Sequence, residues 1–122
     1  MPAAKPFWGD VQGHVGPHIS PAALACAANQ QGDLHLCVFD ANNVLWHTIR
    51  FADRSWQPFW GDVQSQVTPN IGPIQAIACA TNQQGDLHVF GIDQNGVLWH
   101  TIRMADGTWP FPFGNVQVAT RG

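Results

Sequence analysis

The sequence predicts an all-β protein made of two four-stranded blades of a β-propeller. Three observations support this prediction: a tandem repeat that fills the chain, four short extended runs in each repeat, and very few helical signals. Nine prolines and twelve glycines interrupt every stretch long enough for an amphipathic helix. We therefore expect residues 1–122 to form a single propeller segment.

The repeat is visible in two blocks of sequence. The block PFWGDVQ starts at Pro6 and returns at Pro58, and NQQGDLH starts at Asn29 and returns at Asn82. Over the 22 residues that begin at Asn29 and Asn82, 16 positions are identical, including VLWHTIR. A degenerate third copy, FGNVQ, starts at Phe113. The shifts of 52 and 53 residues match the roughly 50-residue period of a propeller blade.

The repeats divide the chain into segments. Residues 6–23 form a leading outer-strand segment and a connection, residues 24–63 the first blade, residues 64–117 a connection and the second blade, and residues 118–122 a tail. Residues 6–12 are a surplus copy of the outer strand. They either pair across a chain junction as a closing strand or begin a connection, and the sequence leaves both open.

The first extended run of each repeat, residues 24–28 and 77–80, consists mostly of small residues. Small side chains suit the innermost strand of a blade, where blades converge on the axis. Cys26 and Cys79 occupy the same place in these runs, where an unpaired cysteine acts as a small hydrophobic residue. Three cysteines without a CxxC pair predict neither a disulfide framework nor a zinc site.

The second and third runs, residues 33–40 and 44–51, are joined by a hairpin signal, DANN in the first repeat and DQNG in the second. The turn is either type I′ or type I with a G1 bulge. The bulged turn would place His35 and His47 on one face of the sheet, and a two-residue turn would place them on opposite faces. A metal site at this histidine pair is a minority option, so we expect no metal and no cofactor.

The fourth run, residues 56–63 and 109–116, is expected to form the outer strand. Pro58 is tolerated there because an edge strand can spare one amide donor. The connections 12–21 and 64–73 would link each outer strand to the next inner strand, near the clefts between blades.

Two blades alone leave an apolar face bare at each end, so we expect the chain to assemble with itself. Closed rings need at least about four blades. A homo-oligomer with cyclic symmetry would complete the ring, with six blades in a trimer and four in a dimer. We favour the trimer.

The charge pattern excludes one class of partner. The formal net charge is -3 and the chain has no basic cluster, so nucleic acid is not an expected partner. The first ten residues lack the apolar run of a signal peptide, and no segment approaches membrane-spanning length. We expect a soluble protein that is cytoplasmic at synthesis, with no membrane insertion and with non-classical release as its route out; its final location stays unassigned.

Four motifs carry a family resemblance: GDLH, NGVLWHTIR, ADGTW and FWGDV. Through them the chain resembles the PLL-type (Photorhabdus lectin-like) β-propeller lectins and, more distantly, the tectonin and tachylectin propellers, over nearly its whole length. The resemblance implies several equivalent sugar sites between blades, often for fucose or related hexoses. Family members usually carry seven blades in one chain, so a site between blades would here fall partly within a chain and partly between chains.

Sugar recognition needs an aromatic platform and fixed hydrogen-bonding groups in a preformed pocket. For each tryptophan the alternative is packing between blades, and His47, among Leu45 and Ile49, is favoured as a core histidine. Arg50 has the alternative of bridging Asp53. The candidate platforms are Trp8, Trp46, Trp56, Trp60, Trp99 and Trp109, and the candidate hydroxyl contacts are Gln30, Gln31, His35, His47, Arg50, Gln83, Gln84, His88, His100 and Arg103.

Catalysis is not expected. The chain lacks a GxSxG nucleophile motif, and it contains no glutamate for a pair of glycosidase carboxylates. Its aspartates lie mainly in predicted turns. The preferred hypothesis is a lectin that acts by multivalent avidity on glycans. The alternative is a non-catalytic propeller scaffold for protein–protein interaction.

Overall fold

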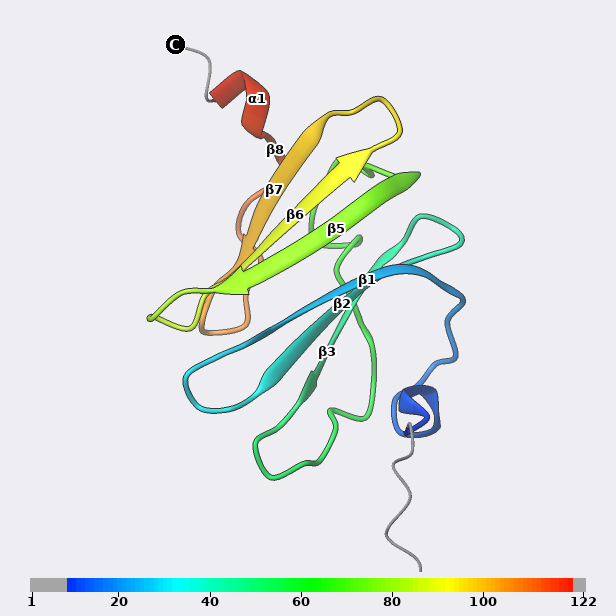
Figure 1. Ribbon diagram of the computed structural model, residues 1–122, viewed down its shortest axis with the longest axis vertical. Helices are drawn as coiled ribbons and strands as arrows, with labels where there is room; N and C mark the ends of the chain where they lie inside the picture. Colours follow the sequence, from blue (N-terminus) through cyan, green and yellow to red (C-terminus); the bar gives the residue numbers. More distant parts are fainter. Residues whose placement is uncertain (1–8, 120–122) are drawn as a thin grey trace, which may run out of the picture.

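A computed structural model describes residues 9–119. Trp8 and residues 6–8 of the leading segment lie outside the described residues, as do residues 120–122 of the predicted tail. The described chain forms two four-stranded antiparallel sheets, in the orders β1-β2-β3-β4 and β5-β6-β7-β8 (Figure 1). The predicted all-β class and the predicted pair of four-stranded units are confirmed.

Each sheet is built from one repeat, and its strands pair with their neighbours in chain order. Each of the two outermost strands is only two residues long. The first sheet contains β1 (Pro21–Ala28), β2 (Leu34–Asp40), β3 (Leu45–Arg50) and β4 (Gly61–Asp62), and the second contains β5 (Ile74–Thr81), β6 (Leu87–Asp93), β7 (Leu98–Arg103) and β8 (Gly114–Asn115).

The predicted second and third strands agree with the structure to within one or two residues. The inner strands begin three residues before the prediction, with a register shift just after Pro21 and Ile74. The predicted outer strands, 56–63 and 109–116, are wrong in extent. Pro58 in the first repeat and Pro110 and Pro112 in the second have no backbone N–H to donate, which limits the ladder to β4 and β8.

Helices are few and short in the described chain. A 3-10 helix, η1 (Val11–Gly13), follows Asp10, whose side chain accepts a hydrogen bond from the Gln12 amide. A four-residue helix, α1 (Val116–Ala119), follows β8 and includes the start of the predicted tail. Within residues 9–119 no helix has the length and apolar content needed to cross a membrane.

The hairpin between β2 and β3 is the bulged one. The Asn43 amide donates to the Asp40 carbonyl at 3.0 Å, the Asp40 amide donates to the Val44 carbonyl at 2.9 Å, and Asn43 has a φ of 67°. This is a type I turn with a G1 bulge. Cys37 is therefore paired with His47, and His35 and His47 lie on the same face of the sheet.

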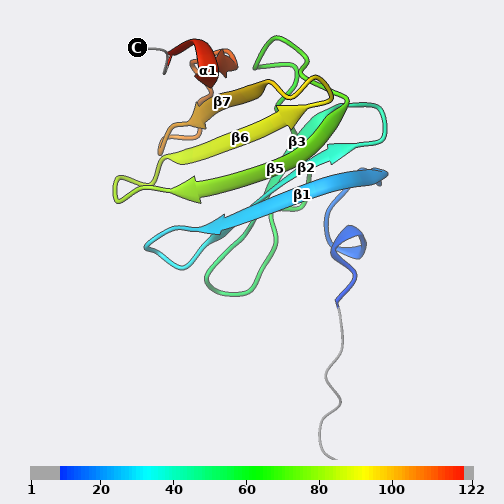
Figure 2. The same ribbon diagram turned by 45° about the horizontal axis from the view of Figure 1, so that its top comes forward.

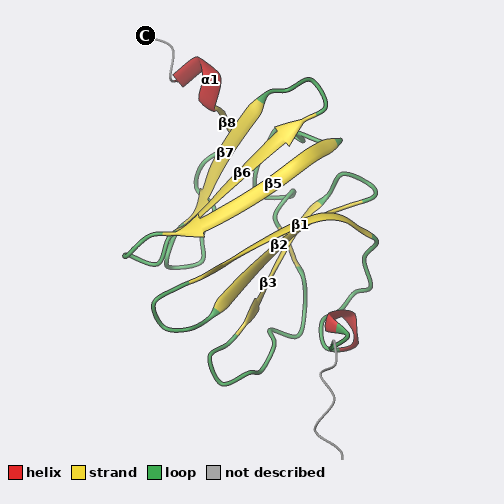
Figure 3. Cartoon of the chain, in the orientation of Figure 1, coloured by secondary structure: helices red, strands yellow, loops and turns green. Residues whose placement is uncertain are grey.

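The two sheets meet at their inner strands. β1 and β5 run side by side, and β3 and β7 lie on opposite sides of this central pair (Figures 1 and 3). In the turned view of Figure 2, β2 and β3 lie above β1 and pass behind β5, so that the two sheets overlap. The Thr81 hydroxyl at the end of β5 donates to the Ala28 carbonyl at the end of β1, which joins the two strands without merging the sheets.

The main core fills the space between the sheets. Phe39 and Leu45 of the first sheet have no exposed surface, and neither have Leu87 and Val89 of the second. Full burial of each such side chain contributes about 1.5–3 kcal/mol. The cluster is completed by Cys37, Val63, Val67, Ile71, Trp109 and Phe113.

A second cluster lies on the other face of the first sheet. Val15 and Ile19 of the leading connection pack there against Val38 and Trp60. Val67 and Ile71, which are the equivalents of Val15 and Ile19 in the next repeat, take part in the main core between the sheets. The described part of the leading segment, residues 9–12, forms a turn and η1, so in these residues it begins a connection.

Candidate functional site

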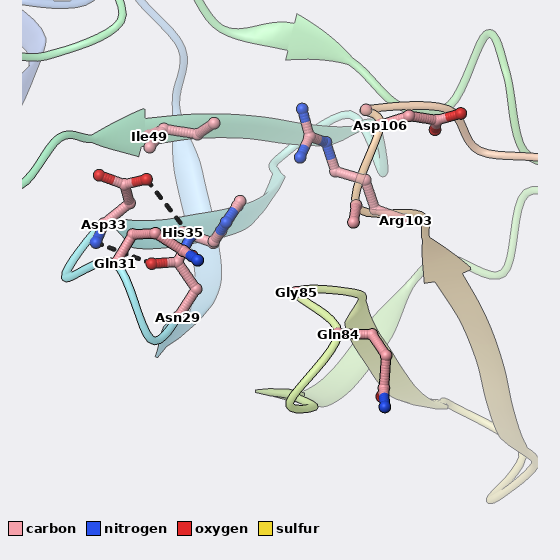
Figure 4. A pocket seen from close by; sticks show the side chains of 11 residues that line it. Asn29, Gln31, Asp33, His35, Ile49, Gln84, Gly85, Arg103 and Asp106 are labelled. Carbon is pink, nitrogen blue, oxygen red and sulfur yellow. Dashed lines mark hydrogen bonds between the residues drawn. The ribbon is translucent and has the colours of Figure 1, made fainter.

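A cavity of about 430 Å3 lies between the two sheets, near the ends of β1 and β5. Figure 4 shows its lining side chains, which come from both sheets. Four predicted site residues meet in it: Gln31, His35, Gln84 and Arg103. The rest of the lining consists of Asn29, Asp33, Ile49, Gly85, Ala105, Asp106 and Gly107.

The loop from β1 to β2 is held by side-chain hydrogen bonds. Asn29 accepts from the Asp33 amide at 3.0 Å and donates to the Asp33 carboxylate at 3.3 Å, as drawn in Figure 4. Asp33 also accepts from the Ala52 amide at 3.0 Å. Asn82 and Asp86 repeat this arrangement in the second sheet. These bonds fix the cavity wall before any ligand arrives.

Arg103 extends from the end of β7 across the cavity, toward the first sheet (Figure 4). Burial lowers its pKa, and the charge of the nearby Asp106 carboxylate opposes this effect. Hydrogen bonds from Thr108 hold the pKa of Asp106 below its usual range, with a further contribution from Arg103. The cavity thus offers a guanidinium with a carboxylate nearby.

His35 and His47 form a hydrogen-bonded pair. Nδ1 of His35 lies 2.9 Å from Nε2 of His47, and both side chains are buried. Burial lowers the pKa of His35, and the charge of Arg103 adds to this effect. Burial also lowers the pKa of His47, well below its usual value, with further contributions from Arg103 and from His35. His47 lies behind His35 and does not line the cavity, which agrees with the core interpretation.

The second sheet repeats the pair at His88 and His100, with a distance of 2.9 Å. This pair lies on the equivalent face of the second sheet, which points away from the first sheet, and Phe90 stacks on His100 with ring centroids 4.6 Å apart. Gln30 and Gln83 are exposed and lie outside the cavity lining.

Four of the predicted platforms have packing roles. The indole N–H of Trp46 donates to Asp40 at 2.8 Å, and that of Trp99 donates to Asp93 at 3.0 Å, which braces each hairpin. Trp60 and Trp109 are buried. The Trp109 ring also meets His47 edge to face at 6.0 Å. None of these four rings lines the cavity between the sheets.

Trp56 and Arg50 lie elsewhere, in a second cavity of about 580 Å3 on the far side of the first sheet. Arg54, Ser55 and His14 also line it, together with Gly9 and Val11. Among the residues that the structure describes, this lining contains two guanidinium groups and no carboxylate. Trp56 is therefore the one described tryptophan of the predicted set that faces either of these two cavities.

No family model matches this chain, and a search of curated proteins also finds no match. Function must therefore be inferred from the two cavities and from the repeat that relates them.

The sequence reasoning missed several lining residues, above all Asn29, Asp33, Asp106 and Arg54. A signal was present, because the first three have identical counterparts at the same place in the other repeat. They resemble ordinary turn residues, so the sequence gives little reason to select them as lining residues. Arg54 stands where the second repeat has Gly107, a difference that a comparison of the copies could have singled out.

Neither cavity has the features of a metal centre. In the part of the chain that the structure describes, no three histidine, cysteine or acidic side chains are grouped as metal ligands. Cys26, Cys37 and Cys79 are free thiols. The chemistry that the lining supports is hydrogen bonding to a polar ligand.

Proposed function

We propose that the protein is a multivalent lectin whose sugar sites lie between successive blades of a propeller ring completed by copies of the same chain. The observation that carries this proposal is the preformed polar cavity between the two sheets. Its volume of about 430 Å3 lies within the usual range for small-molecule sites. The motif resemblance to the PLL-type lectins favours a neutral sugar such as fucose or a related hexose.

The lining suits sugar hydroxyl groups, which both donate and accept hydrogen bonds. The amides of Gln31 and Gln84 offer donors and acceptors, Arg103 offers donors, and the carboxylates of Asp33 and Asp106 offer acceptors. Because no tryptophan or phenylalanine ring of the described residues lines this cavity, each site is expected to be weak on its own. Repeated sites on one particle would supply the affinity.

The exposure of the inner strands supports the ring. Leu24 and Cys26 of β1 are exposed, whereas their counterparts Ile77 and Cys79 of β5 are half-buried against the core between the sheets. The alternate residues of the two strands show the reverse pattern, because Ala27 is packed against that core whereas the alanine at position 80 is exposed. At the inner strands each sheet is thus covered on one face only, and the two covered faces are opposite ones.

The middle strands, β2 and β3 compared with β6 and β7, have the same relationship. Phe39 and Leu45 are fully buried between the sheets, whereas their counterparts Ile92 and Leu98 are partly exposed, Ile92 to 36%. A second copy docked head to tail would cover Ile92 with the apolar side of its own first sheet. That contact would repeat the internal interface, and a heterologous contact of this kind closes into a ring.

Such a junction would rebuild the cavity from two chains. One copy would contribute from its second sheet the counterparts of Asn29, Asp33 and His35, and the next copy would contribute from its first sheet the counterparts of Arg103 and Asp106. This arrangement would give the predicted residues His88 and Arg50 a place in a site. The contributing residues are Asn82, Gln84, Asp86, His88 and Ile102 from one chain, and Gln31, Gly32, Arg50, Ala52, Asp53 and Arg54 from the other.

A glycan array followed by calorimetric titration tests the sugar site. We expect selective binding that free sugar competes away, and a loss of about tenfold in affinity for Gln31→Ala, the equivalent of one or two polar contacts. Gln30→Ala is the matched control, because Gln30 is adjacent, exposed and outside the lining. An assembled protein that binds no glycan would overturn the proposal and favour a scaffold that binds a protein partner.

A disulfide trap tests the ring. Cys79 packs against the core cluster that contains Cys37, across the two sheets, and the repeat equivalents of this pair are Phe90 and Cys26. Phe90→Cys should therefore form a disulfide with Cys26 of the next copy under mild oxidation, and Phe90→Cys with Cys26→Ala should not. Native mass spectrometry should give about three times 13.3 kDa for a trimer. A 13.3 kDa monomer that forms no cross-link would contradict the ring.

A further inference from the structure

Arg54 and Gly107 occupy the same position of two equivalent turns. Arg54 N–H donates to the Phe51 carbonyl and Gly107 N–H to the Met104 carbonyl, both at 2.8 Å. The backbone φ is 77° at Arg54 and 90° at Gly107. This left-handed conformation disfavours every residue type with a Cβ, and glycine is the usual choice. The turn itself therefore gives no reason for an arginine at position 54.

The space beside this position contains another guanidinium. A Cβ added to Gly107 would lie 3.2 Å from an Nη atom of Arg103. In the first repeat the corresponding side chains are Arg54 and Arg50, and both line the second cavity. The second repeat thus has one guanidinium at these two positions, that of Arg103, whereas the first repeat has two, those of Arg50 and Arg54.

The charges around the two arginine sites differ. The cavity between the sheets is lined by Arg103 together with the carboxylates of Asp33 and Asp106. In residues 9–119 the lining of the second cavity has Arg50, Arg54 and His14 and no carboxylate. Ser55 and the half-buried ring of Trp56 complete that wall, so it offers a hydroxyl and an apolar face beside the positive charges.

Paired guanidinium groups have a defined chemical preference. Their planar N–H donors match the two oxygens of a carboxylate, and these charge-assisted bonds are stronger than bonds between neutral groups. Ser55 and Trp56 could contact the hydroxyl groups and the C–H face of a sugar ring that bears the carboxylate.

We propose that the Arg50–Arg54 pair makes a site for acidic saccharides, distinct in specificity from the cavity between the sheets, which takes neutral sugar. The inference rests on the proposed lectin function. In the ring, the pair lies on the first-sheet side of each chain junction. There Arg54 adds, beside the carboxylates of Asp53 and Asp86, a second guanidinium that the cavity between the sheets lacks at Gly107. Acidic sites at junctions then alternate with neutral sites inside chains.

The test exchanges the two residues between the repeats. Arg54→Gly gives the first turn the residue of the second, and Gly107→Arg does the reverse. The probes are free glucuronate, its uncharged methyl ester and a neutral hexose that the array identifies, each titrated by calorimetry. An array with carboxylated and sulfated sugars separates the two acidic groups.

We expect Arg54→Gly to weaken glucuronate binding about tenfold, which corresponds to the loss of one charge-assisted contact. Binding of the neutral hexose should stay unchanged. Gly107→Arg should strengthen glucuronate binding, and added salt should weaken binding of glucuronate more than that of its ester. Circular dichroism checks that each variant is folded.

Two results would overturn the acidic-saccharide site and leave the proposed lectin function standing. One is binding of the neutral hexose with no preference for glucuronate over its ester, and the other is a glucuronate affinity that Arg54→Gly leaves unchanged. Preference for sulfated over carboxylated sugars would overturn the carboxylate assignment. Absence of all sugar binding would instead overturn the proposed lectin function.

Discussion

His35 Nδ1 and His47 Nε2 lie 2.9 Å apart in the buried space between the two sheets. One nitrogen must donate and the other must accept, so a proton added to both rings breaks the bond. Burial lowers the pKa of both groups, and the Arg103 charge adds to the effect. The pair is therefore a neutral polar link that acid should disrupt.

The first prediction concerns pH. A histidine with a lowered pKa in the folded state contributes stability above its unfolded pKa of about 6.5 and loses it as the pH falls toward the folded value. The midpoint of urea unfolding, measured at fixed protein concentration, should therefore decrease below about pH 6.5. His47→Gln should reduce this slope, since its amide can still donate to His35 without titrating. An equal slope in both proteins would contradict the assignment.

The second prediction concerns backbone strain at Arg54. Arg54→Gly should raise the free energy of unfolding by about 0.5–1 kcal/mol, because glycine adopts positive φ without a Cβ clash. Asn43→Gly is the comparison, with a smaller expected gain because asparagine tolerates this conformation better than arginine. Thermal and urea unfolding measure both changes. A destabilised Arg54→Gly protein would show that Arg54 makes a structural contact that outweighs the strain.

The third prediction concerns the indole brace of the hairpin. Trp46→Phe should lower the free energy of unfolding by about 1 kcal/mol or more, because it removes the N–H donor to Asp40. Burial raises the pKa of Asp40, but the bonds from Trp46, Val44 and Asn42 lower it overall. Removing one donor should therefore raise this pKa. NMR titration of the Asp40 carboxyl measures it, and an unchanged value would contradict the role of Trp46.

The fourth prediction concerns cysteine accessibility. Cys26 is exposed on the single chain, and Cys37 is buried, with a pKa raised well above its usual value by Cys79 and by burial. A thiol reagent should label Cys26 at dilutions where the ring dissociates and label it slowly when the ring is assembled. Cys26→Ala is the control that assigns the signal. Equal labelling rates at all concentrations would argue against burial of β1 at a junction.

Much of the fold could be predicted because both copies of the repeat show the same pattern of strands and turns. The alternation of Leu45, Trp46 and His47 fixes the strand, and the glycine of DQNG marks the turn. Two features could not be predicted. The choice of a bulged turn depends on the bond from Asn43 to Asp40, and the short outer strands depend on prolines such as Pro58, whose effect is local.

The candidate site was predictable to a lesser degree. Gln31 and Arg103 were predicted as hydroxyl contacts because their side chains offer hydrogen-bonding groups that recur in both repeats, and both residues line the cavity. The tryptophans could not be sorted, since the same indole can stack on a sugar or donate to an aspartate, as Trp46 does. Only the three-dimensional position of Trp56 separates it from the packing residues.

The opposite exposure of β1 and β5 gives each chain two different end surfaces, and each is complementary to the other one on the next copy. Every added copy presents the same two ends again, so growth stops only where curvature brings the last end to the first. The rotation that relates one sheet to the next would then set the number of copies in the ring. The number of binding sites on one particle would follow from this rotation and not from the number of repeats encoded in one chain.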